Sequence, residues 1–558
     1  MAVSDNAEDL SGLDPAETMK LNSSYLRGTI PQSIADPVTG AMHGDDAELI
    51  RYHGTYQQDD RDVREERRKQ KLEPAYEFMI RVRVPGGVVT PSQWLAMDAL
   101  TREYGSGTLR ITSRQTFQIH RILKENLKSS IAAVNACLLT TFATSGDVGR
   151  NVVCSSNPMA SAQHAAVLHW AQTLSSHLLP NTNAYHELWL DGERVDPAQE
   201  SEPLYGKRYL PRKFKIAIAV PPTNDIDVFK DDIGLIAIFD GDSLQGFNVL
   251  AGGGLSTTQG DATTFPRLSD PVGFVSCDKV IAVAEHIIGI QRDQGNRSSR
   301  KHARLKYTIE RLGVDAFKRE LEARLGFGLE PIRPYHFDTT GDRFGWTETD
   351  DGLQHLCLYL MAGRVGNTEQ CQILDGMREI AKIHDGQFRI TSNQNVIIAN
   401  ITPNNRARVA DLVSGYKLDD YARFHRLRLD ALSCVALPTC PLAMAEAERY
   451  LPHLLAKVEA LTEKHDLCGQ PLLLRISGCP NSCSRSYLGE IGLIGRAVGR
   501  YELRLGADAL GSRLNKLYRE NLDEAGILAS LDDVLGRYAR ERRQDEGFGD
   551  FVIRVGVV

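Results

Sequence analysis

Four of the chain's ten cysteines lie close together in the last quarter of its 558 residues: Cys434 and Cys440 in CVALPTC, and Cys479 and Cys483 in CPNSC. A uniform scatter would place roughly one cysteine in a window of that size, so the grouping needs a chemical cause. Four thiolates can hold a zinc ion or an iron–sulfur cluster. Structural zinc sites use cysteine pairs two to four residues apart, and the spacing of Cys434 and Cys440 fits that pattern poorly.

The residues around these cysteines favour an iron–sulfur cluster, which is wider than a single ion and accepts longer gaps. Pro441 and Pro480 directly follow a cysteine, as in ferredoxin-type runs. Gly478, Asn481 and Ser482 provide turn-forming backbone whose N–H groups can point at sulfide or thiolate. Zinc and coincidentally grouped thiols remain the alternatives. The other six cysteines occur singly and are expected to be small buried hydrophobes: Cys137, Cys154, Cys277, Cys357, Cys371 and Cys468.

Two pairs of cations are the second feature that could do chemistry. Arg81 and Arg83 alternate in EFMIRVRVPGG, and Lys213 and Lys215 alternate in KFKIAIAV. Residues two apart in a strand point to the same face, so each pair places two positive charges on one side of an apolar strand. Either these are solvated edge strands, or the cations bind an anion.

A repeated order of elements positions these residues. EFMIRVRVPGG predicts a strand, PSQWLAMDALTREYG a helix, and GTLRITSRQTFQIH another strand. HLCLYLMAGRV, CQILDGMREIAKIHDG and GQFRITSNQNVIIA repeat this order. Ile111 in the first RITS string matches Ile390 in the second, and this displacement (390 − 111) is half the chain length of 558 residues. We interpret this half-chain displacement as an internal duplication.

The segments outside the repeats complete two related modules. KFKIAIAV, LIAIFD and GFNVLAGGG predict strands between the copies, followed by a basic helix around DQGNRSSRKHARLKYTIERLG. After the second copy come the cysteines, a helix at Ala443–His465, the strand PLLLRISG and a tail of mixed helices. The charge run Asp59–Lys71 is expected to be a solvated helix or arm, with partner docking as the alternative. The pseudo-twofold contact between the modules would suit a large ligand.

Composition limits the function classes. The net charge of −7 argues against a protein devoted to nucleic acid, and 42% hydrophobic residues are typical of a globular chain with room for several domains. No apolar run approaches the roughly 20 residues that cross a bilayer, and the first residues lack a secretory signal. We therefore expect a cytoplasmic protein without membrane contact. A non-catalytic iron–sulfur sensor or zinc scaffold would explain the cysteines but not the cation pairs.

CVALPTCPLAMAEAER followed by ISGCPNSC resembles the siroheme and 4Fe-4S signature of the sulfite and nitrite reductases. The likeness extends through NSSYLRGTI, HGTYQQDDRD, RVPGGVVT, RNVVCSSNP, YLPRKFK, GFNVLAGGGLS, QRDQGNR and KYTIERLGV. It implies an α+β fold of duplicated modules related by a pseudo-twofold axis, with mixed sheets flanked by helices and siroheme at the module interface. The implied domains are an N-terminal extension (1–76), a first ferredoxin-like half of a parachute-type domain (77–143), a central siroheme and substrate domain (144–345), a second ferredoxin-like half (346–420) and a C-terminal 4Fe-4S and siroheme domain (421–558).

The resemblance also implies roles for particular residues. Cys434, Cys440, Cys479 and Cys483 would hold the cluster, and Cys483 would also bridge to the siroheme iron. Two arginines and two lysines would bind the anionic substrate, with the lysines as proton donors and the arginines as clamps: Arg81, Arg150, Lys213 and Lys215. The remaining siroheme contacts implied by the resemblance are Thr112, Arg114, Gln118, His120, Gln394, Asn395, Asn481 and Arg485. Asn393 replaces Arg114 in the second copy. A basic segment would either cover the same pocket or form an exposed helix face: Arg297, Arg300, Arg304 and Lys306.

The implied reaction is the six-electron reduction of sulfite to sulfide in sulfur assimilation. No G-x-G-x-x-G string follows a predicted strand, and Gly252–Gly254 alone is better interpreted as a tight loop near the cofactor, so NADPH is not expected to bind this chain. The resemblance implies that a separate NADPH-oxidising flavoprotein alpha subunit with FAD and FMN supplies the electrons, in a hetero-oligomer. A ferredoxin-dependent nitrite or sulfite reductase is the alternative, which the N-terminal strings make less favourable.

Overall fold

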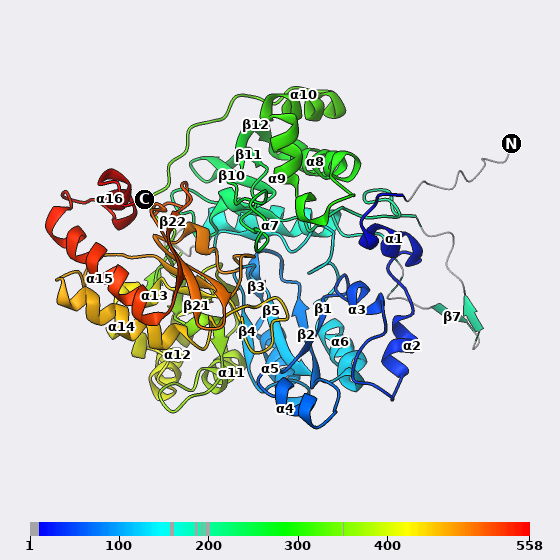
Figure 1. Cartoon of the computed structure of the whole chain (residues 1–558), viewed down its shortest axis with the longest axis horizontal. Coiled ribbons are helices and arrows are strands. Elements are labelled where there is room, and N and C mark those ends of the chain that lie inside the picture. Colours follow the sequence, from blue (N-terminus) through cyan, green and yellow to red (C-terminus); the bar gives the residue numbers. More distant parts are fainter. Residues whose placement is uncertain are drawn as a thin grey trace.

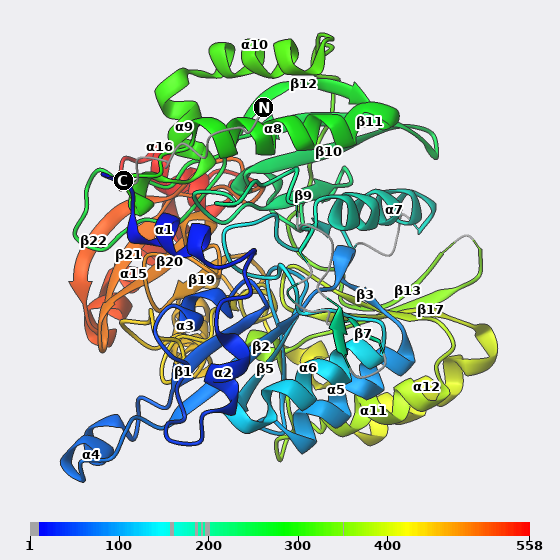
Figure 2. The ribbon, with the colours of Figure 1, turned by 90° about the vertical axis from the view of Figure 1, so that its right-hand side faces the viewer.

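The computed structural model describes residues 11–156, 161–182, 184, 188–190, 193–195, 201–349 and 351–558. Four five-stranded sheets carry the described fold. The two that contain the repeats have shorter strands on average and are called the small sheets, and the other two are called the larger sheets. β7 (Leu188–Leu190) and β8 (Glu193–Val195) form a separate two-stranded ribbon. Figures 1 and 2 show the larger sheet of the first module beside α8 (Val280–Gln294), and Figure 1 shows the larger sheet of the second module beside α14 (Leu451–Lys464) and α15 (Glu524–Glu541).

The two small sheets exchange edge strands. The first has the order β1 (Thr55–Asp59), β2 (Tyr76–Val82), β5 (Phe117–Ile122), β4 (Leu109–Ile111) and β15 (Arg364–Val365). The second has the order β13 (Gly345–Glu348), β14 (Gln354–Leu358), β17 (Val396–Ile401), β16 (Gln387–Ile390) and β3 (Val88–Val89). Each sheet thus takes its last strand from the other copy. This reciprocal exchange confirms the duplication and ties the halves together.

Helices of both copies cover these sheets. They are α5 (Pro91–Glu103), α6 (Leu127–Ala136), α11 (Ile373–Ile383) and α12 (Pro403–Gly415). Trp94 of α5 is fully buried and packs against Phe117 of the first copy and Phe388 of the second, with ring centroids 5.5 and 4.9 Å away. One apolar core therefore spans both halves.

Each string containing RITS was predicted as a single strand, and this was wrong. The structure has two strands and a tight turn in each: β4 and β5 in the first copy, β16 and β17 in the second. The Thr112 hydroxyl accepts the N–H of Arg114, which stabilises a turn over the strand ladder. Gln115 and Gln394 have left-handed φ angles of +52° and +68°, which a continuous strand excludes.

The two larger sheets also repeat one pattern. The first has the order β12 (Asp270–Ser276), β11 (Ser243–Ala251), β10 (Ile233–Asp240), β9 (Ile216–Ala219) and β6 (Val153–Cys154). The second has the order β22 (Lys516–Leu522), β21 (Arg500–Leu505), β20 (Ile491–Ala497), β19 (Leu474–Ser477) and β18 (Leu432–Ser433). In both, three parallel strands continue into antiparallel ones. The tail expected to be helical therefore contains three strands.

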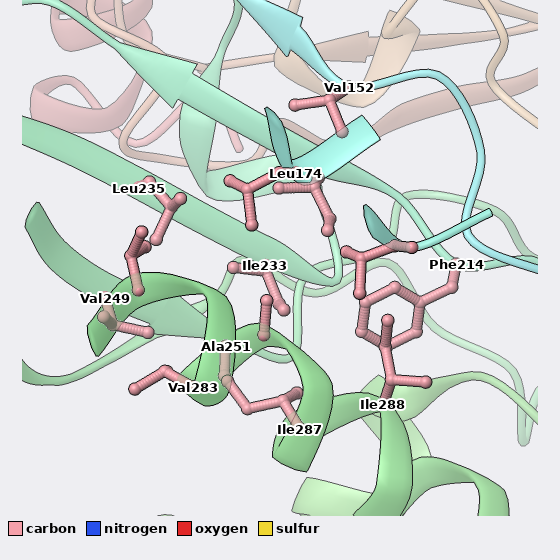
Figure 3. Close-up of a cluster of buried hydrophobic side chains, with 14 of the residues drawn as sticks. Val152, Leu174, Phe214, Ile233, Leu235, Val249, Ala251, Val283, Ile287 and Ile288 are labelled. Atoms are coloured by element: carbon pink, nitrogen blue, oxygen red, sulfur yellow. The ribbon is translucent and has the colours of Figure 1, made fainter. Parts of the chain in front are cut away.

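Helices occupy matching places in the two larger modules. α7 (Ser161–His177) lies between β6 and β9 in the chain, as α14 lies between β18 and β19. Figure 3 shows the resulting core of the first module, where Leu174 of α7 and Ile287 of α8 lie on the sheet residues Ile233 and Val249. The remaining described helices are α1 (Pro15–Asn22), α2 (Ile30–Ala35), α3 (Asp46–Leu49), α4 (Arg64–Lys69), α9 (Leu305–Leu312), α10 (Val314–Leu325), α13 (Arg426–Leu429) and α16 (Phe548–Arg554).

Three helices predicted from the sequence can be compared with the structure. Within the charge run, Arg64–Lys69 form α4, none of whose residues is buried, so the solvated helix is confirmed there, whereas Asp59 ends β1 and is buried. The basic segment is not one helix, because α8 ends at Gln294 and α9 begins at Leu305. The helix expected at Ala443–His465 begins only at Leu451. Among the described helices, none combines the length and apolar character needed to traverse a bilayer.

Candidate active site

The four grouped cysteines lie at one edge of the second larger sheet. β18 and β19 are neighbouring parallel strands, so their carboxyl ends meet at the same edge. Cys434 directly follows β18, and Cys479 and Cys483 lie in the loop after β19. The N–H of Gly478 donates to Cys434 Sγ at 3.3 Å, which joins the two loops.

The charges of the four thiols act on one another. Burial, then the charge of Cys483, raises the pKa of Cys434 and of Cys440, so the sulfur atoms of both loops lie within electrostatic reach of each other. Yet in the described ranges no three His, Cys, Asp or Glu side chains are gathered tightly enough to hold one metal ion. Because the sulfur atoms of both loops lie within reach of each other, the four thiols are the candidate ligands of an iron–sulfur cluster, as the sequence predicts. Cys483 is exposed whereas Cys479 is buried.

Residues of both RITS strings contact the cysteine loops, and the first string also contacts the end of β6 in the first larger sheet. Ser113 Oγ donates to the carbonyl of Cys483 at 2.9 Å. Gln394 Nε2 donates to the carbonyl of Ser433, next to Cys434, at 2.9 Å. In the first copy Gln115 makes the same contact with the carbonyl of Cys154 at 2.8 Å. The duplicated turns therefore hold the ends of β18 and β6 in equivalent ways.

The four candidate substrate cations lie near one another. The N–H of Arg150 donates to the carbonyl of Phe214 at 2.9 Å, which places Arg150 beside the segment of Lys213 and Lys215. The pKa of Lys213 is held well below its usual value by burial and then by neighbouring cations, Lys215 and Arg150 included. Burial, and among the neighbouring charges that of Arg81, lowers the pKa of Arg150. None of the four forms a salt bridge within the described residues.

Lys213 and Lys215 do not lie on a strand face as predicted. β9 begins at Ile216, so both lysines belong to the segment that leads into a central strand of its sheet. Burial, opposed by the charge of Asp231, lowers the pKa of Lys215 to about 7. Near neutral pH this ammonium group can therefore give up a proton and regain it.

Arg83 does not join Arg81 in this group. Its guanidinium is buried and donates to Ser175 Oγ at 3.0 Å and to the carbonyl of Ala143 at 2.9 Å, so it stabilises the core. Arg81 instead pairs with Gln118 across β2 and β5, and Gln118 pairs with Arg110 across β5 and β4. These side chains form one row on the face of the first small sheet.

Several buried polar atoms around this row have no hydrogen-bond partner in the described chain. They are Arg81 Nε, Arg114 Nε, Gln118 Oε1 and His120 Nε2. Buried polar groups are normally paired, so their grouping points to a polar ligand. Burial, then the nearby arginines, keeps the pKa of His120 well below its usual value, so the ring is neutral. The two guanidinium N–H groups can donate to carboxylates and the Gln118 amide oxygen can accept, so the group fits a large cofactor with several carboxylates.

Other candidates make contacts within the protein. Arg114 pairs with Asp231 at 2.9 Å, and Asn395 donates to Asp342 Oδ2 at 2.8 Å. Asn481 donates to Cys479 Sγ at 3.7 Å. The Thr112 hydroxyl lies 2.7 Å from that of Thr116. The basic segment is paired too, through Arg297 with Glu17, Arg300 with Asp147, Arg304 with Asp232, and Lys306 with backbone carbonyls. Of the six single cysteines, Cys154 and Cys357 are buried as predicted, Cys137, Cys277 and Cys371 are half-buried, and Cys468 is exposed, so its predicted burial is wrong.

Asp227 forms salt bridges with two buried arginines. It was not among the residues predicted from the sequence. Arg475 and Arg485 each lie 2.8 Å from Asp227 Oδ2, and both side chains are 2% exposed. Arg485 also donates to the carbonyl of Ser392 at 2.8 Å, so this ion pair joins the cysteine loop to the second copy of the repeat. Asp227 is one of two aspartates in PPTNDID, and nothing in that string would have singled it out.

We expect Asp227→Asn to lower the free energy of unfolding by about 3–5 kcal/mol, because it leaves two arginines buried without a counter-charge. Denaturant titration measures this loss. The matched control is Glu65→Gln, which breaks an exposed pair with Arg68 and should change stability by less than about 1 kcal/mol. Equal, small effects of the two substitutions would contradict the role of Asp227.

Tyr56 of β1 is a second residue that the sequence did not single out. The Arg81 guanidinium carbon lies 5.4 Å from its ring centroid. Burial raises the pKa of Tyr56, but the charges of Arg150 and Arg81 and a hydrogen bond with Ser145 outweigh it and bring the pKa to about 8. A tyrosine in an alternating strand is common, so its place among the cations emerges only from the fold.

Tyr56 should therefore ionise as the pH rises through about 8 in the cofactor-free protein, well before an ordinary tyrosine. Ultraviolet difference absorption of tyrosinate measures this step, and Tyr56→Phe should remove it while the exposed-residue control Tyr335→Phe leaves it. A wild-type protein with no tyrosine titrating below a pKa of about 10 would refute this electrostatic environment.

Comparison with known proteins is consistent with this site. The family model described as the nitrite and sulphite reductase 4Fe-4S domain matches residues 169–329, and that of the nitrite/sulfite reductase ferredoxin-like half domain matches twice, at 70–137 and 347–414. The chain belongs to the nitrite and sulphite reductase family. Members carry a siroheme and a 4Fe-4S cluster, and the side chains described above fit both.

The similar curated proteins share one printed name, sulfite reductase (NADPH) hemoprotein beta-component. The protein from Myxococcus xanthus is 55% identical over 98% of this chain and 97% of its own, and that from Bacillus subtilis is 53% identical over 97% and 95%. The name describes those relatives as one component of a larger enzyme. The structure of the Mycobacterium tuberculosis NirA protein covers 98% of this chain and 96% of its own, with a TM-score of 0.76 at 23% identity, and so shares the fold.

Proposed function

We propose that this chain reduces sulfite to sulfide by six electrons, as the hemoprotein subunit of an assimilatory NADPH-dependent sulfite reductase. The observation that carries the proposal is the group of Arg81, Arg150, Lys213 and Lys215, whose side chains are half-buried and form no salt bridge within the described residues. Four cations gathered in this way repel one another, so the group favours an anion at its centre. Sulfite is such an anion.

The arginines and lysines of this group have different roles in the proposal, because their side chains differ in acidity. Arg81 and Arg150 stay charged and hold the sulfite oxygens. Each oxygen that leaves as water takes up two protons, and Lys215, with a pKa of about 7, can release and regain a proton at neutral pH. Burial raises the pKa of Cys479, whereas the charge of Lys213 acts to lower it, which supports a position of the cations near the cysteine loops. When bound, the siroheme supplies the iron that receives sulfite, and the cluster supplies electrons.

We assign the cofactors to the residues that the resemblance indicated. Cys434, Cys440, Cys479 and Cys483 would hold the cluster, and the Cys483 thiolate would also reach the siroheme; its exposed position supports this role. The siroheme is bound by a set whose unpartnered atoms support the assignment in part: Thr112, Arg114, Gln118, His120, Gln394, Asn395, Asn481 and Arg485. The domain boundaries at 76, 143, 345 and 420 are proposed with it.

The electron donor in this proposal is a separate flavoprotein alpha subunit that oxidises NADPH and carries FAD and FMN, in a hetero-oligomer. The names of the relatives support a partner subunit. A cytoplasmic location goes with the proposal, and the ten cysteines, none of which forms a disulfide in the described structure, are compatible with a reducing compartment.

Reconstitution tests the donor and the substrate together. The purified chain is given either an NADPH-oxidising flavoprotein or reduced ferredoxin, with sulfite or nitrite. We expect sulfide from sulfite with the flavoprotein and a siroheme absorption pattern in the visible spectrum. Turnover with ferredoxin alone would favour the ferredoxin-dependent alternative, and a colourless protein containing zinc would overturn the enzyme assignment.

A further inference from the structure

The duplication gives the cysteine region a counterpart in the first larger module. Ser155 follows β6 as Cys434 follows β18, and the two are related by the same half-chain displacement. In the loop after β9, Asp225 of PPTND occupies the place that Cys483 occupies in CPNSC after β19. Ser155 Oγ donates to Asp225 Oδ1 at 2.6 Å. The counterpart region thus has a hydroxyl and a carboxyl where the second module has thiols, so it cannot hold an iron–sulfur cluster in the same way.

A cavity of about 950 Å³ lies at this counterpart region. Its lining includes Ser155, Pro221, His164, Arg343 and Arg389. None of these residues belongs to the substrate or cofactor groups assigned above. The cavity is therefore a second site, separate from the proposed siroheme site.

Arg389 lines the cavity and forms no salt bridge with any residue that the structure describes. Its side chain is 2% exposed, and neither Nε nor Nη1 has a hydrogen-bond partner in the described structure. Only Nη2 is used, in a 3.3 Å bond to Asn400 Oδ1. A guanidinium buried in this way is destabilising unless an anion pairs with it.

The matching arginine in the first repeat shows what is missing. The half-chain displacement relates Arg389 to Arg110, and each of the two begins its RITS string. Arg110 pairs with Glu448 at 3.0 Å and donates to the carbonyl of Ser433 at 3.0 Å. The fold thus satisfies one arginine with a carboxylate of its own and leaves the other open toward a cavity.

The histidines and carboxylates around Arg389 restrict the size and charge of the ligand that the cavity can hold. His164 is 2% exposed, and its Nε2 also lacks a hydrogen-bond partner among the described residues. Burial and then the charge of Arg389 keep the pKa values of His164 and His355 below their usual value, so both rings are neutral. A neutral Nε2–H can donate to an anion. Four carboxylates also line the cavity, and they disfavour an anion as large and highly charged as a polycarboxylate macrocycle: Asp242, Asp338, Glu348 and Asp351.

We propose that this cavity is a second anion site, in which Arg389 and His164 bind a small oxyanion of the carboxylate or inorganic type. The bound anion supplies the counter-charge that Glu448 gives to Arg110. Because the site is outside the proposed catalytic group, its occupancy stabilises the fold independently of sulfite reduction.

Thermal unfolding of the holoenzyme in chloride-free buffer, with increasing sulfate or acetate, tests the site. The anion also reaches the substrate cations, so wild type is compared with Arg389→Met and Arg389→Lys. We expect the anion to raise the Tm of wild type and of Arg389→Lys well beyond that of Arg389→Met, because binding to the folded state stabilises it. Stronger stabilisation by sulfate than by acetate identifies an inorganic oxyanion, and the reverse identifies a carboxylate.

Without added anion, Arg389→Met should be at least as stable as wild type, because it removes an uncompensated charge. The matched control Arg110→Met should lose stability at every anion concentration, because it removes a paired cation. Equal anion-induced Tm increases in wild type and Arg389→Met would overturn the proposal. Should Arg389→Met fail to fold, crystals of the wild type soaked in selenate decide: an anomalous peak at Arg389 supports the site, and a peak at the substrate cations without one at Arg389 overturns it.

Discussion

Replacing Cys483 by serine should abolish sulfide formation and change the visible spectrum of the bound siroheme. Cys483 is the exposed member of the four grouped cysteines, and its loop is held by the bond from Ser113 to the Cys483 carbonyl. A serine hydroxyl is a far poorer ligand for iron than a thiolate, so both proposed roles of the sulfur are lost together. Loss of a residue that only hydrogen-bonds to a metal ligand costs up to roughly 100-fold in activity. Because Cys483 is proposed as a ligand itself, we expect a larger fall in activity.

The control is Cys468→Ser. Cys468 is exposed too, but it lies outside the four and should tolerate the same change with full activity and an unaltered spectrum. Iron and acid-labile sulfide are measured in both variants, so loss of the cluster is distinguished from loss of the bridge alone. Near-normal turnover of Cys483→Ser would refute the shared thiolate.

The duplication was predictable from the sequence because it repeats both a string and an order of elements. The half-chain displacement also relates contacts that no string displays. It carries Gln115 onto Gln394 and Cys154 onto Ser433, so the same glutamine-to-carbonyl bond occurs twice. The sequence could indicate the repeat, but not that each small sheet takes an edge strand from the other copy, since that exchange depends on long-range pairing.

Predictions failed where long-range packing decides. Arg81 and Arg83 have the same spacing as any pair on one strand face, yet β2 ends at Val82 and Arg83 turns into the core toward Ser175. The turn in each RITS string depends on a threonine hydroxyl and a left-handed residue, which an apolar alternation does not reveal. Tyr56 and Asp227 were missed because their roles come from charges that lie far away in the chain.

Replacing Lys215 by methionine should slow sulfite reduction by about 100-fold or more, the usual contribution of a positioned proton donor. Methionine keeps the length and packing of the side chain but removes the ammonium group. Because Lys215 is not among the assigned cofactor ligands, the siroheme spectrum and the cluster content should stay unchanged. The control Lys207→Met removes an exposed lysine of the same region and should leave the rate unaltered.

Lys215→Arg separates binding of the anion from proton transfer. Arginine keeps the positive charge but does not release a proton at neutral pH, whereas burial brings the pKa of Lys215 to about 7. We therefore expect Lys215→Arg to keep a KM for sulfite near that of wild type while its kcat falls almost as far as that of Lys215→Met. Lys215→Met should lose in both parameters, because its charge is gone as well. A kcat that Lys215→Arg restores would make Lys215 a clamp for the anion and leave Lys213 as the donor of protons.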